Sequence, residues 1–452
     1  MALIFDLYII IVSIIILRNL KLGFFITLIS HIIIPAVVRF KLGPISIAIY
    51  DVFMMCLILS FLIHKRYRKI KLPKPIHKYF IIYITSTFLL IFLSTGYVPY
   101  NYQILSFFKN FLFQVILYII VGFYIIRNQD YYKYINILLI VSLIAGIYGI
   151  FSYVLKSNPY ITTLNMIYSG NDLFAVFMDE SRGGLEGRTY GTMGHPLAWG
   201  QFWNIILCFI WIIRNNIRKY LTFILIAVGI INIVLCGSRT AIVTSIVFLL
   251  FILLQYGIKK LLFIIPLSYI SLIICMAILP QNIKNSNMIK YIESGIYFWD
   301  SSYSERANIQ GSSKEMRYIQ LQNSIRIMER NPIGGIGYNY EYYSLSTGRT
   351  ISDNLYGLES ILFKTLIEQG IIGLFVFIYT YNILRRYAVI KNKEQKILTN
   401  GYFFSFFVSM IFTGIQGNSY IYFMIFLMLF LENPHKICTN SKKINANILP
   451  AQ

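Results

Sequence analysis

Three arginines lie in short polar segments beside long apolar runs, and their chemistry is that of anion binding. Arg188 lies in residues 187–196, Arg239 in the turn 237–240, and Arg317 in the polar stretch 313–330. A guanidinium group binds phosphate through paired hydrogen bonds and stays charged when partly desolvated. An arginine between hydrophobic helices is costly unless it has an anionic partner. Two alternatives stay open: Arg239 reaches lipid phosphate, and Arg317 is an ordinary surface residue.

A proton acceptor is also present near the end of the polar region. Asp353 precedes an apolar run and is the carboxylate best placed to act as a general base, with His195 as the second candidate. The alternative for Asp353 is a helix N-cap or an Asx turn. Asn354 and Tyr338 are the further candidates for contact with substrate.

The glycines in residues 334–337 predict a tight turn. They lack the Lys-Ser/Thr pair of a nucleotide-binding P-loop, which argues against ATP. The long polar loops contain no cluster of carboxylates of the kind that Mg²⁺ prefers, and the five cysteines form no metal or disulfide pattern. We therefore expect neither a metal nor a cofactor.

The composition predicts a membrane protein. The chain has 452 residues, of which 57% are hydrophobic and 13% charged, and its mean hydropathy is +0.65. Apolar runs of roughly 17–25 residues are long enough to cross a bilayer as helices, and they lack the alternating polarity of barrel strands. We predict an all-α, polytopic protein with about 12–13 transmembrane helices. The expected spans are 3–17, 22–38, 45–63, 79–95, 105–126, 135–155, 196–213, 220–236, 240–256, 261–279, 359–382, 397–414 and 418–431.

The distribution of charge predicts the orientation. The formal net charge is +22, but the 40 Lys and Arg residues lie mostly in short loops, which indicates membrane orientation instead of a nucleic-acid partner. Residues 64–78 hold seven basic residues and no acid, so the positive-inside rule places them in the cytoplasm. The basic loops 127–134, 214–219, 259–260 and 385–396 then fall on the same side. The polar segments that contain the candidate residues fall on the opposite, extracytoplasmic face.

Six regions follow from this topology. Within the large loop, residues 313–330 contain no helix breaker and end before Asn331-Pro332, which predicts a helix. On it, Arg317 lies beside a stripe of Leu321, Ile325 and Met328, while Arg326 and Arg330 point elsewhere. The regions are N-terminal transmembrane helices (1–155), a first extracytoplasmic loop (156–195), central transmembrane helices (196–279), a large extracytoplasmic loop (280–358), C-terminal transmembrane helices (359–431) and a cytoplasmic tail (432–452).

The order of these motifs resembles the O-antigen polymerase and O-antigen ligase family of bacterial glycan assembly. The matching features are the arginine of residues 188–196, the turn 238–241, the arginine helix running into residues 331–337, residues 353–356, and residues 368–373. The resemblance implies a GT-C-like, metal-independent glycosyltransferase of the bacterial cytoplasmic (inner) membrane, with undecaprenyl diphosphate-linked glycans as donor and acceptor. Arg188, Arg239 and Arg317 would then bind the donor diphosphate, since arginines stabilise a departing phosphate.

The resemblance favours polymerisation of glycan repeat units. The ligase branch of the family carries a histidine before the Asn that matches Asn354, and this chain has Asp353 there. The product would be O-antigen or capsular polysaccharide, and the partners would be membrane lipid and a chain-length regulator protein, with no nucleic acid. The alternatives are an O-antigen ligase or protein O-oligosaccharyltransferase of the same family, and a transporter or flippase of lipid-linked glycans.

Overall fold

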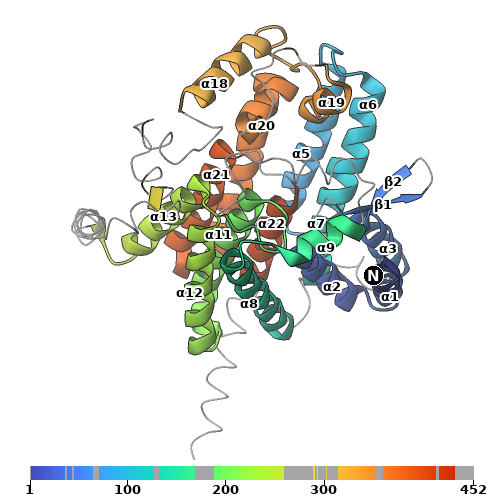
Figure 1. Cartoon of the computed structure of the whole chain (residues 1–452). Coiled ribbons are helices and arrows are strands. Elements are labelled where there is room, and N and C mark those ends of the chain that lie inside the picture. Colours follow the sequence, from blue (N-terminus) through green and yellow to red (C-terminus); the bar gives the residue numbers. More distant parts are fainter. Residues whose placement is uncertain are drawn as a thin grey trace, which may run out of the picture.

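The chain folds into a tightly packed set of helices with one short β-hairpin (Figure 1). The computed structural model describes residues 2–35, 38–42, 45–64, 71–126, 132–167, 188–258, 289–290, 293, 302, 314–349, 351, 358, 360–413 and 417–432. The elements of the first half are α1 (Ala2–Arg18), α2 (Leu20–Ile33), β1 (Arg39–Leu42), β2 (Ile45–Ala48), α3 (Ile49–Ile63), α5 (Lys74–Phe92), α6 (Tyr100–Ser106), the π-helical η1 (Phe107–Leu117), α7 (Tyr118–Ile126), α8 (Tyr132–Val154) and α9 (Pro159–Ile167).

In the described part of the second half, the regular elements are all helices. Its elements are α11 (Pro196–Ile213), η2 (Arg214–Asn216), α12 (Lys219–Leu235), α13 (Arg239–Leu254), α18 (Lys314–Met328), α19 (Tyr340–Thr347), α20 (Ile361–Lys391), η4 (Lys393–Gln395), α21 (Lys396–Phe412) and α22 (Gly417–Leu431).

The helices confirm the predicted fold class of a multi-pass, mostly helical membrane protein. Among the described residues, five helices are long and apolar enough to cross a membrane, and seven shorter apolar helices accompany them. The predicted span 261–279 lies outside the described residues. The polar loop helix predicted over 313–330 is α18, which ends at Met328, just before Asn331-Pro332.

Two boundary predictions at the β-hairpin were wrong. The span expected over 22–38 stops at Ile33, and the start of the span expected over 45–63 is a strand, because β1 and β2 form an antiparallel hairpin that pairs Arg39 with Ala48. The physical reason lies in Pro35, which disfavours helical backbone in the residue before it. Ile34 accordingly has an extended conformation, with φ −96° and ψ 126°.

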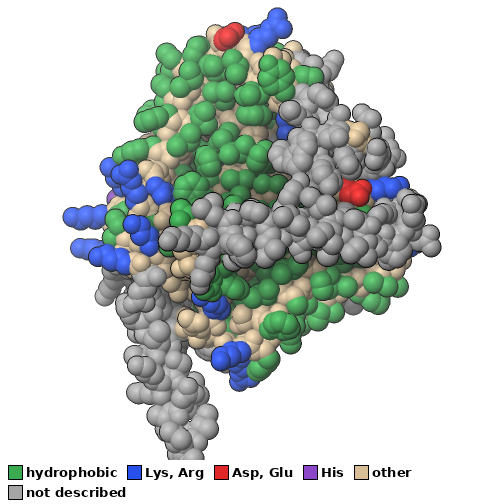
Figure 2. All heavy atoms as spheres, turned by 90° about the vertical axis from the view of Figure 1, so that its left-hand side faces the viewer, with side chains coloured by type: hydrophobic (Ala, Val, Ile, Leu, Met, Phe, Trp, Pro, Cys, Tyr) green, Lys and Arg blue, Asp and Glu red, His purple; other side chains and the backbone are tan. Residues whose placement is uncertain are grey.

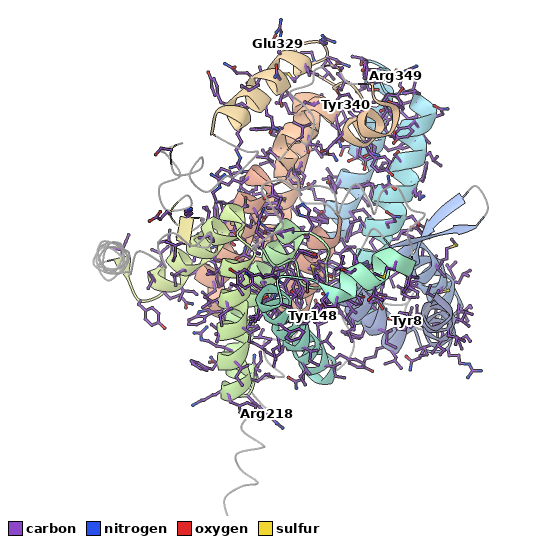
Figure 3. All side chains as sticks on the ribbon, in the orientation of Figure 1. Tyr8, Tyr148, Arg218, Glu329, Tyr340 and Arg349 are labelled. Carbon is purple, nitrogen blue, oxygen red and sulfur yellow. The ribbon has the colours of Figure 1, made fainter. Side chains whose placement is uncertain are left out.

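The bundle has two chemically different ends. Helices α13 and α21 are antiparallel, because Ser405 donates a hydrogen bond to the Thr244 carbonyl (2.9 Å) while Gly401 lies against Phe248. Arg239 and Phe412 therefore lie at one end, which we call the motif end. The basic residues at the start of α12 and between α20 and α21 lie at the other, the basic end. Figure 3 shows Arg218 far from Glu329 and Arg349, in agreement with this polarity.

Glycines allow large aromatic side chains to fill the centre of the bundle. A Cβ atom at Gly146 would lie 2.3 Å from the ring of Trp203, and one at Gly229 would lie 2.9 Å from the same ring. Trp199 and Trp203 are fully buried between α8, α11 and α12. Small residues at helix contacts favour close approach in membranes, where packing replaces the hydrophobic effect as the main attraction.

The outer surface is largely hydrophobic, as contact with lipid requires. Figure 2 shows hydrophobic side chains over a broad area of one face, with Lys and Arg gathered toward its margins. Exposed apolar side chains on several helices, such as Leu89, Phe223 and Phe375, contribute to this surface. An apolar surface of this extent marks an interaction site, and here the lipid bilayer covers it.

We expect the two ends to differ in accessibility from outside the cell. Glu329 and Arg218 are both exposed and lie at opposite ends. Glu329→Cys should react with a membrane-impermeant maleimide on intact spheroplasts, whereas Arg218→Cys should react only after permeabilisation. The background is a variant in which alanine replaces the native cysteines Cys56, Cys208, Cys236, Cys275 and Cys438. Labelling of Arg218→Cys in intact spheroplasts would contradict the orientation inferred from the loop charges.

Candidate functional site

Arg188 lies directly on the turn between α12 and α13. Its Nε donates to the Cys236 carbonyl (2.9 Å), and one terminal nitrogen donates to the Gly237 carbonyl (3.3 Å). Gly237 has a φ of +59°, and a Cβ atom there would lie 3.1 Å from Arg188 Nε. The backbone of Thr189 continues the contact by donating to the Leu235 carbonyl (2.9 Å). The first two sequence motifs therefore form one unit.

The same turn presents Arg239 at the start of α13. Ser238 caps the helix, because its Oγ accepts a hydrogen bond from the Ala241 backbone N–H (3.3 Å). Arg239 is the first helical residue, where the partial positive charge of the helix N-terminus adds to that of the guanidinium. An anion at this turn would meet Arg239 and the helix dipole together.

His195 caps the neighbouring helix α11. Its Nδ1 accepts a hydrogen bond from the Leu197 backbone N–H at 3.2 Å, which leaves the proton of the neutral ring on Nε2. A Cβ atom at Gly200, five residues further along α11, would lie 2.8 Å from Cys236 Sγ. The structure thus places His195 at the motif end and gives its imidazole a capping role.

Arg317 faces the membrane helices, as its place on the helix predicted. Its guanidinium carbon lies 5.2 Å from the centre of the Phe412 ring, and a terminal nitrogen donates to the Phe412 carbonyl (3.5 Å). A cavity of about 180 Å³ surrounds this contact. It is lined by Arg317, Tyr318, Gln320, Leu321, Ser360, Phe363, Ile411 and Phe412.

The stripe expected beside Arg317 was partly wrong. Gln320, Ser324 and Ile327 are the buried residues of α18, whereas Ile325 is 41% exposed. The helix is therefore rotated from the orientation that apolar residues alone predict. Burial of Ser324 is tolerated because its hydroxyl donates to the Gln320 carbonyl (2.6 Å) within the same helix. Arg326 and Arg330 are exposed, as expected.

The three arginines lie at one end of the bundle. Thr244 and Ser405 mark one level of the antiparallel pair α13 and α21. At 1.5 Å per residue, Arg239 lies about 8 Å beyond that level and Phe412 about 10 Å beyond it. Arg188 contacts the turn that precedes Arg239, and Arg317 contacts Phe412. Segments distant in the sequence therefore meet at the motif end.

The glycine-rich segment 331–338 is a clasp between two helices. Asn331 donates to the Leu93 carbonyl (2.7 Å) at the end of α5. On the other side, Ile336 donates to the Ile367 carbonyl (2.9 Å), and Ile371 donates to the Pro332 carbonyl (2.8 Å). Helix α20 breaks here, because Gly370 has φ +67° and ψ −167°. The glycines therefore shape a turn, as predicted, and that turn stabilises the break in α20.

Tyr338 follows the clasp and packs against the π-helical segment η1, which lies between α6 and α7. Its ring makes edge contacts with Phe107 and Phe111, and its backbone N–H donates to Gln103 Oε1 (2.8 Å). Desolvation, with Glu368 and Tyr83 adding to it, raises the pKa of Tyr338 well above its ordinary value. The phenol therefore stays neutral and can donate a hydrogen bond to substrate, but it does not serve as a base.

A buried group of charges was missed by the sequence analysis. Lys364 lies 2.9 Å from Glu341 and 4.0 Å from Glu368, and Glu368 is 4% exposed. Glu368 Oε1 also accepts from the Glu341 backbone N–H (3.5 Å) at the start of α19. The signal was the spacing of Lys364 and Glu368, four residues apart at the start of an apolar run, where charges are costly and need partners. This cluster ties α19 to α20.

Asp353 and Asn354 lie outside the described residues. Their described neighbours are Ile351, whose N–H donates to the Tyr340 hydroxyl (3.0 Å), and Ser360, which caps α20 and lines the Arg317 cavity. Among the residues that the structure describes, no three His, Cys, Asp or Glu residues cluster as metal ligands.

A family model described as O-Antigen ligase matches residues 224–378. The match covers about a third of the chain, and that part is similar to the O-antigen ligase family. The matched region holds Arg239, Arg317, the 331–338 clasp and the break in α20. A comparison of the whole chain with curated proteins finds no match.

The clasp predicts a specific effect of Gly335→Ala. Gly335 has φ +68°, and a Cβ atom there would lie 2.5 Å from the Ile367 carbonyl oxygen. We expect a loss of roughly 2–4 kcal/mol in free energy of unfolding, from backbone strain and overpacking together. The measurement is unfolding of the purified protein in detergent. The matched control is Gly348→Ala, because Gly348 has φ +67° and no atom within 4 Å. Equal losses in the two variants would show that the close contact is unimportant.

Proposed function

We propose that this protein polymerises lipid-linked glycan repeat units. It would transfer the growing glycan from undecaprenyl diphosphate to the non-reducing end of a lipid-linked acceptor unit, on the extracytoplasmic face of the bacterial cytoplasmic membrane. The observation that carries the proposal is the meeting of Arg188, Arg239 and Arg317 at the motif end. Three guanidinium groups at one level suit a diphosphate group.

The reaction follows from the chemistry of the donor. An acceptor hydroxyl oxygen attacks the anomeric carbon of the donor glycan, and the bond from that carbon to the diphosphate oxygen breaks. The diphosphate leaves with the electron pair, and its developing charge is stabilised by the arginines. In the proposal, Asp353 takes the proton of the acceptor hydroxyl. Asn354 and Tyr338 would bind the glycan.

His195 is the less suitable base of the two. Its Nδ1 accepts the capping hydrogen bond of α11, and in the neutral ring Nε2 already carries the proton, so neither nitrogen is suited to accept one. Capping is a sufficient reason for a histidine at this position. The proposal therefore keeps Asp353 as the base and assigns His195 to positioning the start of α11.

An O-antigen ligase is the alternative that the family supports equally well. A ligase, or a protein O-oligosaccharyltransferase, would use the same donor and the same arginines with a different acceptor. Asp353, in place of the histidine of the ligase branch, favours the polymerase. The test supplies purified protein with labelled donor and one acceptor at a time. Transfer of the label to a lipid-linked repeat unit indicates a polymerase. Transfer to a lipid A core or to an acceptor protein indicates one of the ligases.

A transporter of lipid-linked glycans is the third candidate. It would move the lipid across the bilayer without forming a bond, so flipping in proteoliposomes without chain extension would favour it. Charged and strongly polar groups line the centre of many transporters. In the described part of this chain the arginines with candidate roles lie instead at one end, which favours chemistry at that end.

Loss of the Arg317 charge should slow glycan transfer. We expect Arg317→Ala to lower the rate of chain extension by about 10²-fold, as loss of one preorganised charge-stabilising group does. The measurement is the extension rate with purified protein and lipid-linked repeat units in proteoliposomes. The matched control is Arg326→Ala, on the exposed face of the same helix, which should extend at the parental rate. Arg239→Ala should resemble Arg317→Ala. Unchanged extension in both Arg317→Ala and Arg239→Ala would refute the proposed diphosphate site.

Replacement of Asp353 by Asn should separate donor binding from transfer. The amide is close in size to the carboxylate but cannot accept the proton, so transfer should fall by about 10²–10⁴-fold. Binding of the lipid-linked donor, followed by native mass spectrometry, should persist. Parental activity in Asp353→Asn would remove this residue as the base.

A further inference from the structure

A second cleft lies at the far end of α18, away from the Arg317 cavity. It has a volume of about 310 Å³ and is lined by Thr95, Gly96, Tyr97, Arg330, Ile336 and Ile351. This volume is at the lower end of the range for small-molecule sites. Arg317 and Arg330 are 13 positions apart along the chain, which corresponds to about 20 Å along a helix. A group bound at one site therefore cannot also occupy the other.

The cleft is held in shape by the clasp beneath it. Thr95 donates its backbone N–H to the Gly335 carbonyl (3.1 Å) and its hydroxyl to the Ile336 carbonyl (3.3 Å). Ile336 is fully buried in a small apolar cluster that includes Val98 and Tyr340. Ile351 is attached on the other side, because its N–H donates to the Tyr340 hydroxyl. The walls are thus set by packing before any ligand binds.

The cleft offers an aromatic ring with a polar edge. Tyr97 is 37% exposed, and its ring centre lies 5.8 Å from that of Tyr340. Desolvation raises the pKa of Tyr97, and neighbouring tyrosines raise it further, so its hydroxyl remains a hydrogen-bond donor. A partly exposed tyrosine combines an apolar ring face with a donor at its tip, and this suits the C–H face and hydroxyl edge of a sugar ring.

Arg330 gives this cleft a positive charge, because it lines the cleft wall. Arg349 is a second exposed arginine, and its charge, like that of Arg330, lowers the pKa of the Tyr97 hydroxyl. Arg349 and Tyr340 both lie at the end opposite Arg218 (Figure 3). Both arginines are exposed, and within the described chain neither forms an ion pair, even though Glu329 adjoins Arg330 in sequence. Guanidinium groups beside a sugar-sized cleft favour a carboxylate or phosphate substituent on the ligand.

We infer that this cleft is a glycan subsite that binds an acidic sugar through Tyr97 and Arg330. The inference rests on the proposed function for the statement that the ligand is part of a glycan. Because Arg317 lies about 20 Å away along α18, the bound sugar is distant in the chain from the one that reacts at the diphosphate. Such a subsite would retain a long glycan between successive additions and select acidic repeat units.

The test uses two soluble tetrasaccharides and the full chain in lipid nanodiscs. Tetragalacturonic acid is the acidic probe and maltotetraose the neutral one, and saturation-transfer NMR titrations give the dissociation constants. We expect the acidic probe to bind, and Tyr97→Ala and Arg330→Gln each to weaken binding by about tenfold, as loss of a hydrogen bond to a charged group does. Tyr97→Phe, which keeps the ring, should bind more tightly than Tyr97→Ala. Arg326→Gln, on the same helix but not in the cleft, should match the parent.

Each other outcome has a definite meaning. Equal binding of the acidic and neutral probes, binding unaffected by Tyr97→Ala and Arg330→Gln, or no binding of the acidic probe would overturn the subsite. Chain extension assayed on the same preparations separates the two proposals. Extension by the parent without binding of the probe refutes the subsite and leaves the polymerase intact. If binding of the probe depends on Tyr97 but the protein neither extends nor ligates lipid-linked units, the glycan-binding subsite is supported and the proposed glycan-transfer activity is refuted.

Discussion

The motif end depends on backbone carbonyl groups that other segments of the chain satisfy. Turns at the ends of membrane helices expose carbonyls that can no longer bond within the helix, and burial without a partner is costly. Arg188 donates hydrogen bonds to two carbonyls of the Gly237 turn, and Asn331 donates one to the Leu93 carbonyl at the end of α5. At the break in α20, the Ile371 N–H donates to the Pro332 carbonyl, and the Ile367 carbonyl accepts from the Ile336 N–H. These long-range hydrogen bonds hold the polar segments at fixed positions on the bundle.

Glycine makes this arrangement possible at a few positions. At Gly335 and Gly370 the backbone has positive φ, and the carbonyl of another segment lies within 2.6 Å of where a Cβ atom would stand. Any other residue would meet both strain and a steric clash. The break at Gly370 also allows the first turns of α20 to leave the line of the rest of the helix. Those turns bring Lys364 and Glu368 under α19, where Lys364 pairs with both Glu341 and Glu368.

Arginine therefore serves two purposes at this end. Arg188 uses hydrogen bonds to the backbone to join two motifs, so its charge is delivered to a position that the turn defines. Arg317 instead lies over the Phe412 ring beside a cavity, and Arg330 borders a separate cleft at the other end of α18. A single polar helix, laid across the ends of membrane helices, thus borders two cavities of different chemistry. In the two proposals, Arg317 in the first cavity binds a lipid phosphate, and Tyr97 and Arg330 in the second bind a sugar.

The sequence by itself determined the helical class, the approximate spans and the loop helix, because apolar length, charge distribution and proline are local signals. It could also show that Arg317 lies away from Arg326, since helix periodicity determines the relative faces. Only the tertiary structure decided that Arg188 lies on the Gly237 turn, that His195 is a cap, that residues 331–338 clasp α5 to α20, and that Lys364, Glu341 and Glu368 form a buried cluster. These contacts join residues far apart in the chain, and no local pattern specifies which carbonyl a distant side chain will reach. The rotation of α18 was also decided by tertiary packing, because the helix packs against α20 with Gln320, Ser324 and Ile327 buried while Ile325 stays exposed.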